Sequence, residues 1–361
     1  MRIGVPREVK LLESRVGLAP DSVRQLTERG HQVIVEAGAA SRLGISDADY
    51  VAAGADIADS AQAVFAGAEL IVKVKEPQPT EYGLLEPRHI LFTYLHLAGM
   101  RELTDALCTS GATAVAYETV TSSDGGLPLL KPMSEIAGRL AVHAGATCLQ
   151  KSQGGSGVLI SGATGLPPAK VLVLGGGTAG SNAAFIALGM QAAVTIVDRS
   201  ADRLQQLRQR FGERLSTAVS GESVIAELAA DADLVIGAVL LTGACAPKLI
   251  TRETVRRMRA GSVIVDIAID QGGCCETSRP TTLAEPTFIV DEVVHYCVTN
   301  MPGDVPRTST FALNKATLPY VLAIADHGWE AASAADSGLA KGLNVQDGKI
   351  CHPAVAASFR T

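Results

Sequence analysis

"KVLVLGGGTAGSNAAFIALGM", residues 170–190, joins a strand-like run of valine and leucine to an alanine-rich helical run through a turn of glycines. Gly175, Gly177 and Gly180 have the spacing of a dinucleotide-binding turn. The first glycine permits the tight turn, the second lets the backbone approach a pyrophosphate, and the third lets the helix meet the strand. Amide groups and the positive dipole end at the start of that helix favour phosphates. The stretch therefore predicts a Rossmann-type α/β domain.

A second strand-like run, "AAVTIVD", follows and ends in Asp198, 18 residues after Gly180. A carboxylate at this position accepts hydrogen bonds from the ribose hydroxyls of an adenosine. It also repels the additional phosphate of NADP, although the neighbouring Arg199 offsets part of that repulsion. A glycine turn without a ligand is the alternative interpretation. The strand, the helix and the acid occur together, and this combination favours a site for NAD.

The composition excludes several classes of protein. The 361 residues are 47% hydrophobic and 19% charged, and their net charge is −6 without a basic run, which argues against nucleic acid or an anionic membrane as a partner. No stretch approaches the ~18 apolar residues of a membrane span, and the first ten residues lack the apolar core of a signal peptide. The seven cysteines are scattered, and the adjacent pair Cys274 and Cys275 lacks the spacer of a zinc or redox motif. We expect reduced thiols in a cytoplasmic protein.

The length suggests about two domains. Residues 1–128 alternate strand-like and amphipathic helical stretches, whereas the glycine turn lies far inside the chain. We predict an α/β fold with two domains, each a mostly parallel, doubly wound sheet. Residues 1–128 form the first part of a substrate domain, residues 129–306 form the inserted NAD-binding domain, and residues 307–361 return to the substrate domain.

Three polar side chains lie near predicted strand ends in the first domain. Arg15 follows the strand-like run "RIGV", Lys75 follows "LIVKV", and His96 lies in "HILFTYLHLA", for which we predict a buried strand from Ile90 to Leu97. Ligands of parallel sheets bind at the carboxyl ends of the strands, so these residues are expected to converge. A lone histidine in an apolar run is more often a packed core residue, and that interpretation of His96 remains open.

Asp270 is the corresponding candidate in the second domain. It follows the strand-like run "GSVIVD", and by the same rule the loop after that run faces the dinucleotide crevice. Asp270 is therefore expected near the nicotinamide ring. The alternative is that its carboxylate caps the amino end of a helix.

Nine segments, in order along nearly the whole chain, resemble the bacterial L-alanine dehydrogenase family: "ESRVGLAP", "VKVKEP", "LFTYLHLA", "AYETV", "PMSEIAGRLA", "GGGTAGSNAA", "DLVIGAVL", "DIAIDQGGC" and "SRPTT". The resemblance implies oxidative deamination of L-alanine to pyruvate and ammonia with NAD, run in either direction. It also implies a homohexamer. Gly176 departs from the family, in which an alanine is common at that position.

The resemblance also assigns roles to individual residues. It implies that Arg15 and Lys75 bind substrate and that His96 and Asp270 catalyse. It implies that the cofactor is bound by Ser134, Gly175, Gly177, Thr178, Ala179, Gly180, Asp198, Arg203, Ser220, Val239, Leu240, Ile267, Ala268, Ile269, Asp270, Arg279, Val298, Thr299, Asn300 and Met301. It further implies that Glu118 and His327 bind magnesium.

Two other functions remain open at this point. The NAD-binding subunit of proton-translocating transhydrogenase resembles the same two-domain architecture, but it binds NAD without deaminating a substrate. A dehydrogenase of the saccharopine or lysine-forming type is the second alternative, and its substrate is longer and carries more charges than alanine.

Overall fold

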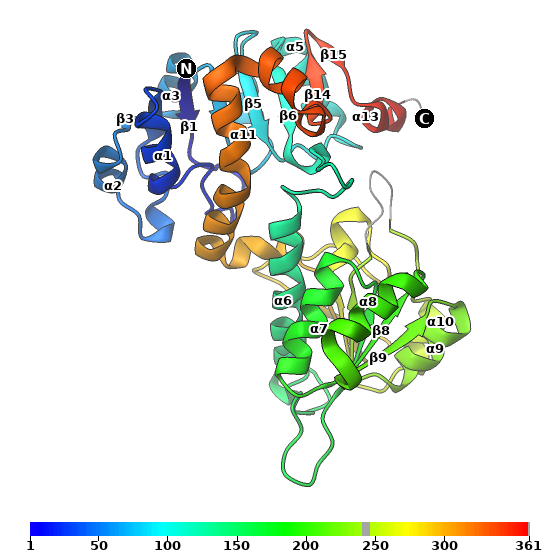
Figure 1. Cartoon of the computed structure of the whole chain (residues 1–361). Helices are drawn as coiled ribbons and strands as arrows, with labels where there is room; N and C mark the ends of the chain where they lie inside the picture. The colour runs from blue at the N-terminus through cyan, green and yellow to red at the C-terminus, as the bar shows by residue number, and fades with distance from the viewer. Residues whose placement is uncertain (240–245, 360–361) are drawn as a thin grey trace. The chain divides into compact units, whose positions relative to one another are not determined.

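The computed structural model describes residues 1–239 and 246–359. The chain divides into two compact units, each with its own sheet (Figure 1). Unit 1 comprises Met1–Met133 and Val305–Thr361, and unit 2 comprises Ser134–Asp304. The chain therefore leaves unit 1 once and returns to it, so unit 2 is an insertion.

Within the described residues, unit 1 is built on a sheet of eight strands in the order β15-β14-β6-β5-β4-β1-β2-β3. The first six strands along the chain pair in parallel, whereas β14 and β15 are antiparallel additions beside β6. Their bounds are β1 Arg2–Val5, β2 Gln32–Glu36, β3 Asp56–Ala58, β4 Leu70–Val72, β5 Ile90–Thr93, β6 Thr113–Ala116, β14 Leu343–Gln346 and β15 Lys349–Ile350. The chain order reverses between β1 and β4, which makes that gap the topological switch point of the sheet.

The helices of unit 1 cover this sheet, and the described ones are α1 Pro20–Thr27, α2 Asp47–Ala52, α3 Ala61–Gly67, α4 Pro79–Tyr82, α5 Arg101–Ser110, α11 Pro306–Ala335, α12 Ser337–Ala340 and α13 Pro353–Ser358. Helices α1 and α11 lie side by side although almost 300 residues separate them (Figure 1). Asn314 of α11 accepts a hydrogen bond from the Ala19 amide at 2.6 Å and from the Ser22 hydroxyl at 3.0 Å. The returning segment is thus fixed to the amino end of α1.

Unit 2 has seven strands among its described residues, in the order β12-β13-β11-β10-β7-β8-β9. All pair in parallel except β12, and the order reverses between β7 and β10. The bounds are β7 Lys170–Leu174, β8 Ala193–Asp198, β9 Leu215–Val219, β10 Leu234–Gly237, β11 Val263–Asp266, β12 Thr287–Val290 and β13 Val293–Tyr296. This is the predicted doubly wound arrangement, and the α/β fold class is confirmed.

Apolar layers on the two faces of the unit 2 sheet account for its helices: α6 Lys131–Cys148, α7 Thr178–Gly189, α8 Ala201–Phe211, α9 Glu222–Asp231 and α10 Arg252–Arg257. Alternate residues of β7 contribute to different layers, because Val171 and Val173 pack in one core and Leu172 and Leu174 in the other. Strands covered on both faces read as continuous apolar runs, which is why "VLVL" precedes the glycine turn.

The strand predicted from Ile90 to Leu97 is shorter than the sequence suggests. Strand β5 ends at Thr93, and the next residues form a loop in which His96 has a left-handed φ of 51°. The amides of Leu95 and His96 donate to the side chain of Glu118 and not to a neighbouring strand. The apolar residues continue past the strand because Leu95 and Leu97 are buried in the core below the loop.

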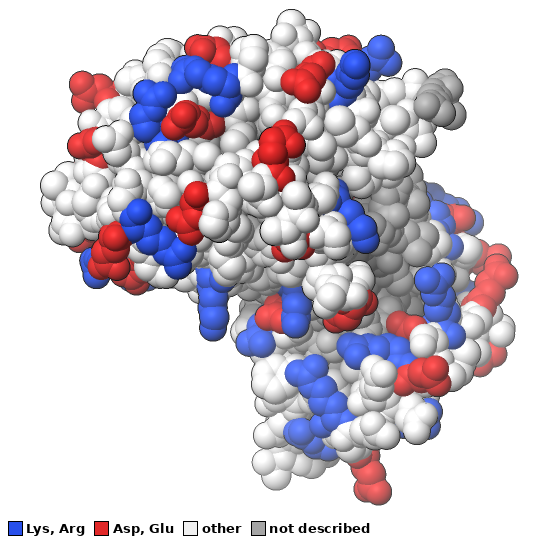
Figure 2. All heavy atoms as spheres, turned by 45° about the horizontal axis from the view of Figure 1, so that its top comes forward, with Lys and Arg blue, Asp and Glu red and all other residues white. Residues whose placement is uncertain are grey.

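No helix within the described residues is long and apolar enough to cross a membrane. On the face shown in Figure 2, lysine and arginine side chains are interspersed with aspartate and glutamate. The six cysteines of the described chain all have free thiols: Cys108, Cys148, Cys274, Cys275, Cys297 and Cys351.

Candidate functional site

In unit 1, the loops that follow β1, β4, β5 and β6 leave the sheet at one edge because these strands are parallel. They carry Arg15, Lys75, His96 and Glu118, in that order. Strands β1 and β4 are neighbours across the switch point, so the loops with Arg15 and Lys75 start side by side. The predicted convergence of these loops is therefore a property of the sheet topology.

Arg15 is almost completely buried, with 1% of its surface exposed. Its Nε and one terminal nitrogen donate to the two carboxylate oxygens of Glu13 at 2.7 and 2.6 Å, and the other terminal nitrogen donates to Sδ of Met133 at 3.1 Å. Burial by itself raises the pKa of Glu13, but the hydrogen bonds and charge of Arg15 hold that pKa at about 2. Glu13 thus stays ionised at neutral pH and fixes the plane of the guanidinium.

A cavity of about 400 Å³ adjoins this pair. It is lined by residues 7–15 of the loop after β1 and by Gly38, Ala39, Ser41 and Arg42. Arg15 and Glu13 form part of its wall, so the buried ion pair borders space that a small molecule can enter.

A second buried carboxylate joins the loops that carry Arg15 and Lys75. Glu8, from the first loop, accepts hydrogen bonds from the backbone amides of Val74 at 2.6 Å and Lys75 at 3.2 Å. The fully buried ammonium of Lys73 lies 3.3 Å from Glu8 and 2.8 Å from Glu81. Removing either carboxylate would leave a buried charge with one partner fewer, so this cluster fixes the backbone at Lys75.

His96 is exposed, which excludes the interpretation of this residue as a packed core histidine. Its backbone amide donates to Oε1 of Glu118 at 2.6 Å, and the amide of Leu95 donates to the same oxygen at 3.2 Å. The imidazole stacks on the ring of Tyr94, with centroids 5.7 Å apart. The Tyr94 hydroxyl in turn donates to the carbonyl of Leu129 at 2.6 Å. The histidine is therefore presented to solvent on a loop with a fixed backbone.

The residues predicted to bind magnesium have other surroundings. Glu118 accepts the two backbone amides just described, whereas His327 is exposed beside the kink of α11 at Gly328. Burial lowers the pKa of another histidine, His352, and the charge of the Glu118 carboxylate opposes that shift. Glu118 therefore interacts electrostatically with His352. Within residues 1–239 and 246–359, no group of three His, Cys, Asp or Glu side chains is placed to hold a metal. Magnesium binding by Glu118 and His327 therefore stays a prediction.

In unit 2, each of the three glycines of the turn is favoured over other residues for a different structural reason. Gly175 has a φ of 97°, a conformation that residues with a side chain rarely adopt. A Cβ at Gly180 would overlap the carbonyl oxygen of Gly175, so only glycine lets α7 approach β7 this closely. A Cβ at Gly177 would meet no protein atom within 4 Å. Gly177 therefore borders open space in front of the first amides of α7, which is where a phosphate would bind.

Asp198 and Arg203 hold the tip of the turn from both sides. The amide of Gly176 donates to Oδ2 of Asp198 at 2.7 Å, and Nε of Arg203 donates to the Gly176 carbonyl at 2.7 Å. Oδ1 of Asp198 accepts the amide of Ser200 at 2.8 Å. Each carboxylate oxygen has a second lone pair, so Asp198 can still accept a hydroxyl. A Cβ at Gly176 would approach Cδ1 of Leu207 to 2.8 Å, so an alanine there would require a small shift of that side chain.

Most of the other predicted cofactor residues lie at the carboxyl edge of the same sheet: Thr178 and Ala179 at the start of α7, Ser220 after β9, Val239 after β10, Ile267, Ala268, Ile269 and Asp270 in the short helix η5 Ile267–Gln271 after β11, and Val298, Thr299, Asn300 and Met301 after β13. Asp270 is exposed, and its Oδ1 accepts the amide of Asn300 at 3.3 Å. Ser134 lies in α6, and the guanidinium of Arg279 is 4.2 Å from the ring centre of Phe288. Leu240 lies outside the described residues.

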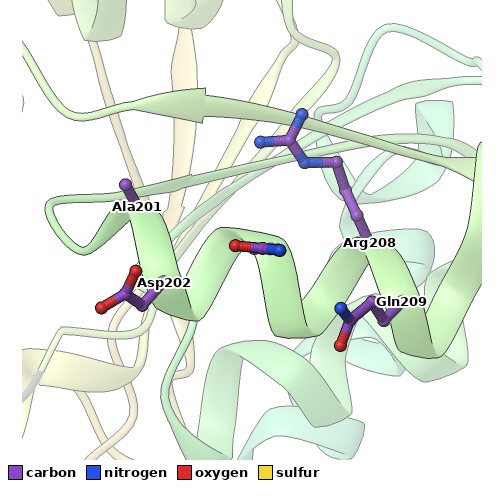
Figure 3. Close-up of a pocket in the computed structure, with 5 residues that line it drawn as sticks. Ala201, Asp202, Arg208 and Gln209 are labelled. Atoms are coloured by element: carbon purple, nitrogen blue, oxygen red, sulfur yellow. The ribbon is translucent and has the colours of Figure 1, made fainter.

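A broad surface hollow lies along α8 and is lined by Ala201, Asp202, Gln205, Arg208 and Gln209 (Figure 3). All five residues belong to one helix, and their spacing places them on one face of it. Leu204 and Leu207, on the opposite face, are buried in the core. The hollow contains none of the predicted site residues, and we assign it no function.

Glu8, Glu13 and Tyr94 are not among the site residues predicted from the sequence, although all three organise the unit 1 site. Glu13 is two residues from Arg15, and in an extended segment side chains two apart point to the same side. Acidic residues in "PREVKLLESR" were thus a usable signal for an internal ion pair. The partners of Glu8 and Tyr94 lie 66 and 35 residues away, and no local pattern indicates them.

Comparison with known proteins gives matches along the whole chain. Residues 4–137 match the N-terminal domain and residues 141–353 the C-terminal domain of the family described as alanine dehydrogenase/PNT. An alanine dehydrogenase of Halomonas elongata is 55% identical over 359 residues, covering 99% of this chain and 97% of the relative. A solved L-alanine dehydrogenase structure is 52% identical, with a TM-score of 0.96 over 100% of this chain and 99% of the other.

A solved transhydrogenase from Sinorhizobium meliloti superposes with a TM-score of 0.84 at 23% identity, covering 97% of this chain and 100% of the other. At that identity the likeness concerns the fold alone. The two domain matches and the relative with more than half of its residues identical over the full length decide the affiliation. This chain belongs to the alanine dehydrogenase/PNT family.

Proposed function

We propose that this protein catalyses the NAD-dependent oxidative deamination of L-alanine to pyruvate and ammonia, and the reverse reductive amination. The observation that carries this proposal concerns the loops of unit 1. They bring the buried guanidinium of Arg15, the ammonium of Lys75 and the exposed imidazole of His96 to one edge of the sheet. The inserted unit of the same chain has the dinucleotide turn. The 55% identity to an alanine dehydrogenase supports this assignment.

The residues of unit 2 fit NAD. The open space at Gly177 accommodates a pyrophosphate against the amides of α7, and Asp198 is available to the adenosine ribose. A carboxylate at Asp198 disfavours the 2′-phosphate of NADP. We assign unit 2 as the NAD-binding domain and unit 1 as the substrate domain. NAD, when bound, accepts the hydride from Cα of alanine.

Arg15 and Lys75 bind the substrate carboxylate. The guanidinium of Arg15 is oriented by Glu13, so the plane of its N–H groups is fixed. Lys75 contributes a compact positive charge to the same carboxylate or to the carbonyl oxygen of pyruvate. The charge of Lys75, like that of Arg15, lowers the pKa of Glu13. The two cations therefore act on the same carboxylate.

His96 moves the protons. The ammonium group of alanine must lose a proton before hydride leaves Cα, the resulting imine must add water, and the carbinolamine must take up a proton at nitrogen to expel ammonia. Imidazole is the side chain most often used for general acid–base catalysis, and that of His96 is exposed. We assign Asp270 the second catalytic role, which is to orient the attacking water.

The direct test is NADH formation by the purified protein with L-alanine, followed by a panel of amino acids and 2-keto acids with NAD and NADP. We expect turnover with alanine and NAD and, in reverse, with pyruvate, ammonia and NADH. Tight binding of NADH without alanine-dependent turnover would instead favour the transhydrogenase-like function. Equal kcat/KM with both dinucleotides would contradict the role of Asp198.

We also propose that the protein is a homohexamer in the cytoplasm. The unpaired thiols of the described cysteines are compatible with a reducing compartment. Light scattering on the eluting protein measures the assembly, and the expected mass is six times the chain mass of 37.3 kDa. A monomer or dimer that retains full activity would contradict the hexamer.

A further inference from the structure

We propose that Lys248 and Asp266 are positioning residues that together hold residues 271–278 in one conformation and so fix the dinucleotide-binding groups on either side of this segment. The proposal rests on the proposed function, because it assigns Asp270 and Arg279 to the NAD site. It adds two residues that do not themselves touch the dinucleotide.

The carbonyl groups of the segment show what Lys248 does. The Gln271 carbonyl accepts the amide of Ala246 at 2.9 Å, and the Cys274 carbonyl accepts the amides of Leu249 and Ile250 at 2.7 and 3.1 Å. The remaining carbonyls of this run, on Gly272, Gly273 and Cys275, accept from Nζ of Lys248 at 2.5, 2.8 and 3.2 Å. The ammonium therefore replaces backbone partners for the carbonyls of Gly272 and Gly273, and at Cys275 it adds to the amide of Ser278, which donates to the same carbonyl at 3.2 Å.

The geometry suits a lysine. Gly272 and Gly273 have φ values of 87° and 77°, and these consecutive left-handed residues turn both carbonyls toward the same point. An ammonium has three N–H groups that diverge from one nitrogen, whereas the donors of a guanidinium lie in one plane. Three converging oxygens thus match Lys248 better than an arginine in its place.

Asp266 binds the same segment from its other side. This carboxylate is fully buried at the end of β11, and its Oδ2 accepts the amides of Cys274 at 2.9 Å and Cys275 at 3.3 Å and the hydroxyl of Ser278 at 2.7 Å. Burial, and then the nearby Asp266 charge, raise the pKa of the Cys274 thiol well above its usual range, so the thiol stays protonated. Cys275 is therefore held twice, by its amide to Asp266 and by its carbonyl to Lys248.

The segment is connected directly to candidate NAD-binding groups. Its first amides, of Gly272 and Gly273, donate back to the carbonyls of Ile269 at 2.9 Å and Ala268 at 3.0 Å in η5, the short helix that carries Asp270. At its other end, Ser278 immediately precedes Arg279. A shift of the segment therefore displaces both groups, and displacements near 1 Å in a binding site reduce activity on the order of 10²-fold.

The decisive variant is Lys248→Met, which keeps a long stem and removes the three donors. Lys170→Met is the matched control, because Lys170 is also exposed in unit 2 and forms an ion pair with Asp231 at 2.5 Å at the start of β7. Both full-length variants are measured for the dissociation constant of NADH by fluorescence, KM for NAD, kcat, and the midpoint of thermal unfolding.

We expect Lys248→Met to raise the NADH dissociation constant and the KM for NAD by ~10-fold or more, while Lys170→Met leaves both unchanged. The thermal midpoint should fall more in Lys248→Met, which loses the donor to three carbonyls, than in Lys170→Met, which loses one exposed ion pair, and Lys248→Arg should restore only part of the NADH affinity. NADH affinity in Lys248→Met equal to that of the wild type would overturn the proposal. So would a loss of stability with unchanged NADH affinity, because that pattern indicates a merely structural lysine.

Asp266→Ala provides a second measurement on the same segment. It removes the acceptor of the Cys274 and Cys275 amides and of the Ser278 hydroxyl, so we expect weaker NADH binding in the folded fraction, measured by titration at low temperature. Unchanged NADH affinity in this variant would also contradict the proposal. The proposed function is tested separately, because its failure would remove alanine-dependent turnover from the wild type itself.

Discussion

His96 occupies a backbone conformation that a residue with a side chain adopts only when neighbouring groups stabilise it. Its φ of 51° lies in the left-handed region, and the Glu118 carboxylate accepts its amide at 2.6 Å. The loop does not continue the regular pairing of β5, and it carries an exposed imidazole that stacks on Tyr94. Strain of this kind is often kept where a side chain must point in one direction.

A prediction for His96 follows from its exposure. His96→Ala removes the acid–base group without removing buried surface, so the variant should fold, bind NADH and lose ~10²- to 10⁴-fold in kcat. His143→Ala, at an exposed histidine of α6, is the control and should keep full activity. Near-normal turnover of the His96 variant would show that another group transfers the protons.

Glu118 gives a prediction that separates two roles. If its carboxylate positions His96, then Glu118→Ala should lower kcat by ~10-fold or more with little change in KM for NAD, because the two amides lose their acceptor. Glu102→Ala, at an exposed position of α5, should behave as the wild type. EDTA should leave wild-type kcat unchanged. A wild-type activity abolished by EDTA and restored by Mg²⁺ would support metal binding instead.

Glu13 makes stability depend on acidity. Its pKa is about 2 in the folded protein and about 4.5 when unpaired, so its ionised form stabilises the fold above pH 4.5, and this contribution is lost as the pH falls through about 2. The shift corresponds to about 3 kcal/mol at neutral pH. The gap in thermal midpoint between the wild type and Glu13→Gln should therefore narrow between pH 7 and pH 3. Glu227→Gln, at an exposed site of α9, should have the thermal midpoint of the wild type at both pH values.

At the scale of elements, α7 begins where the backbone must remain bare. Gly177 precedes its first residue and faces open space, whereas Gly180 touches the turn itself. Replacing the two glycines should therefore have different effects. A side chain at Gly180 interferes with the fold, and a side chain at Gly177 interferes with a ligand.

This difference predicts the effect of Gly177→Ala. The variant should keep the thermal midpoint of the wild type, because no protein atom lies within 4 Å of the added methyl group, but it should raise KM for NAD on the order of 10-fold, or about 1.4 kcal/mol. Gly189→Ala, at the other end of α7 and equally open, is the control and should leave KM for NAD unchanged, while its thermal midpoint should stay the same or rise because alanine favours a helix. An unchanged KM in Gly177→Ala would mean that no phosphate approaches this position.

At the scale of the whole molecule, the chain enters unit 2 once and leaves it once, and unit 2 has apolar layers of its own on both faces of its sheet. We therefore expect a fragment of residues 131–304, which keeps α6 whole, to fold alone. It should bind NADH about as tightly as the full chain and show no alanine-dependent turnover. A soluble, folded fragment that fails to bind NADH would contradict the assignment of the dinucleotide to unit 2.

Local sequence patterns were enough to predict the fold class, the insertion of one unit into the other and the edge at which the candidate site residues gather. These features follow from apolar runs of strand length, from the glycine turn, and from the rule that parallel strands present their carboxyl ends at one edge. Arg15, Lys75, His96 and Asp270 became candidates in this way, because each follows a strand along the chain. Family resemblance supplied the more distant candidate cofactor residues.

How those side chains are held follows from the tertiary structure and not from any local pattern. The pairing of Arg15 with Glu13, the carboxylate of Glu118 beneath His96, and the ammonium of Lys248 among three carbonyls depend on which loops meet when the sheets close. It also ended β5 at Thr93, because the amides that would extend the strand bond to a side chain 23 residues away from Leu95. Local sequence specifies each segment's own conformation, whereas the partners of buried polar groups come from distant segments and are fixed only by packing.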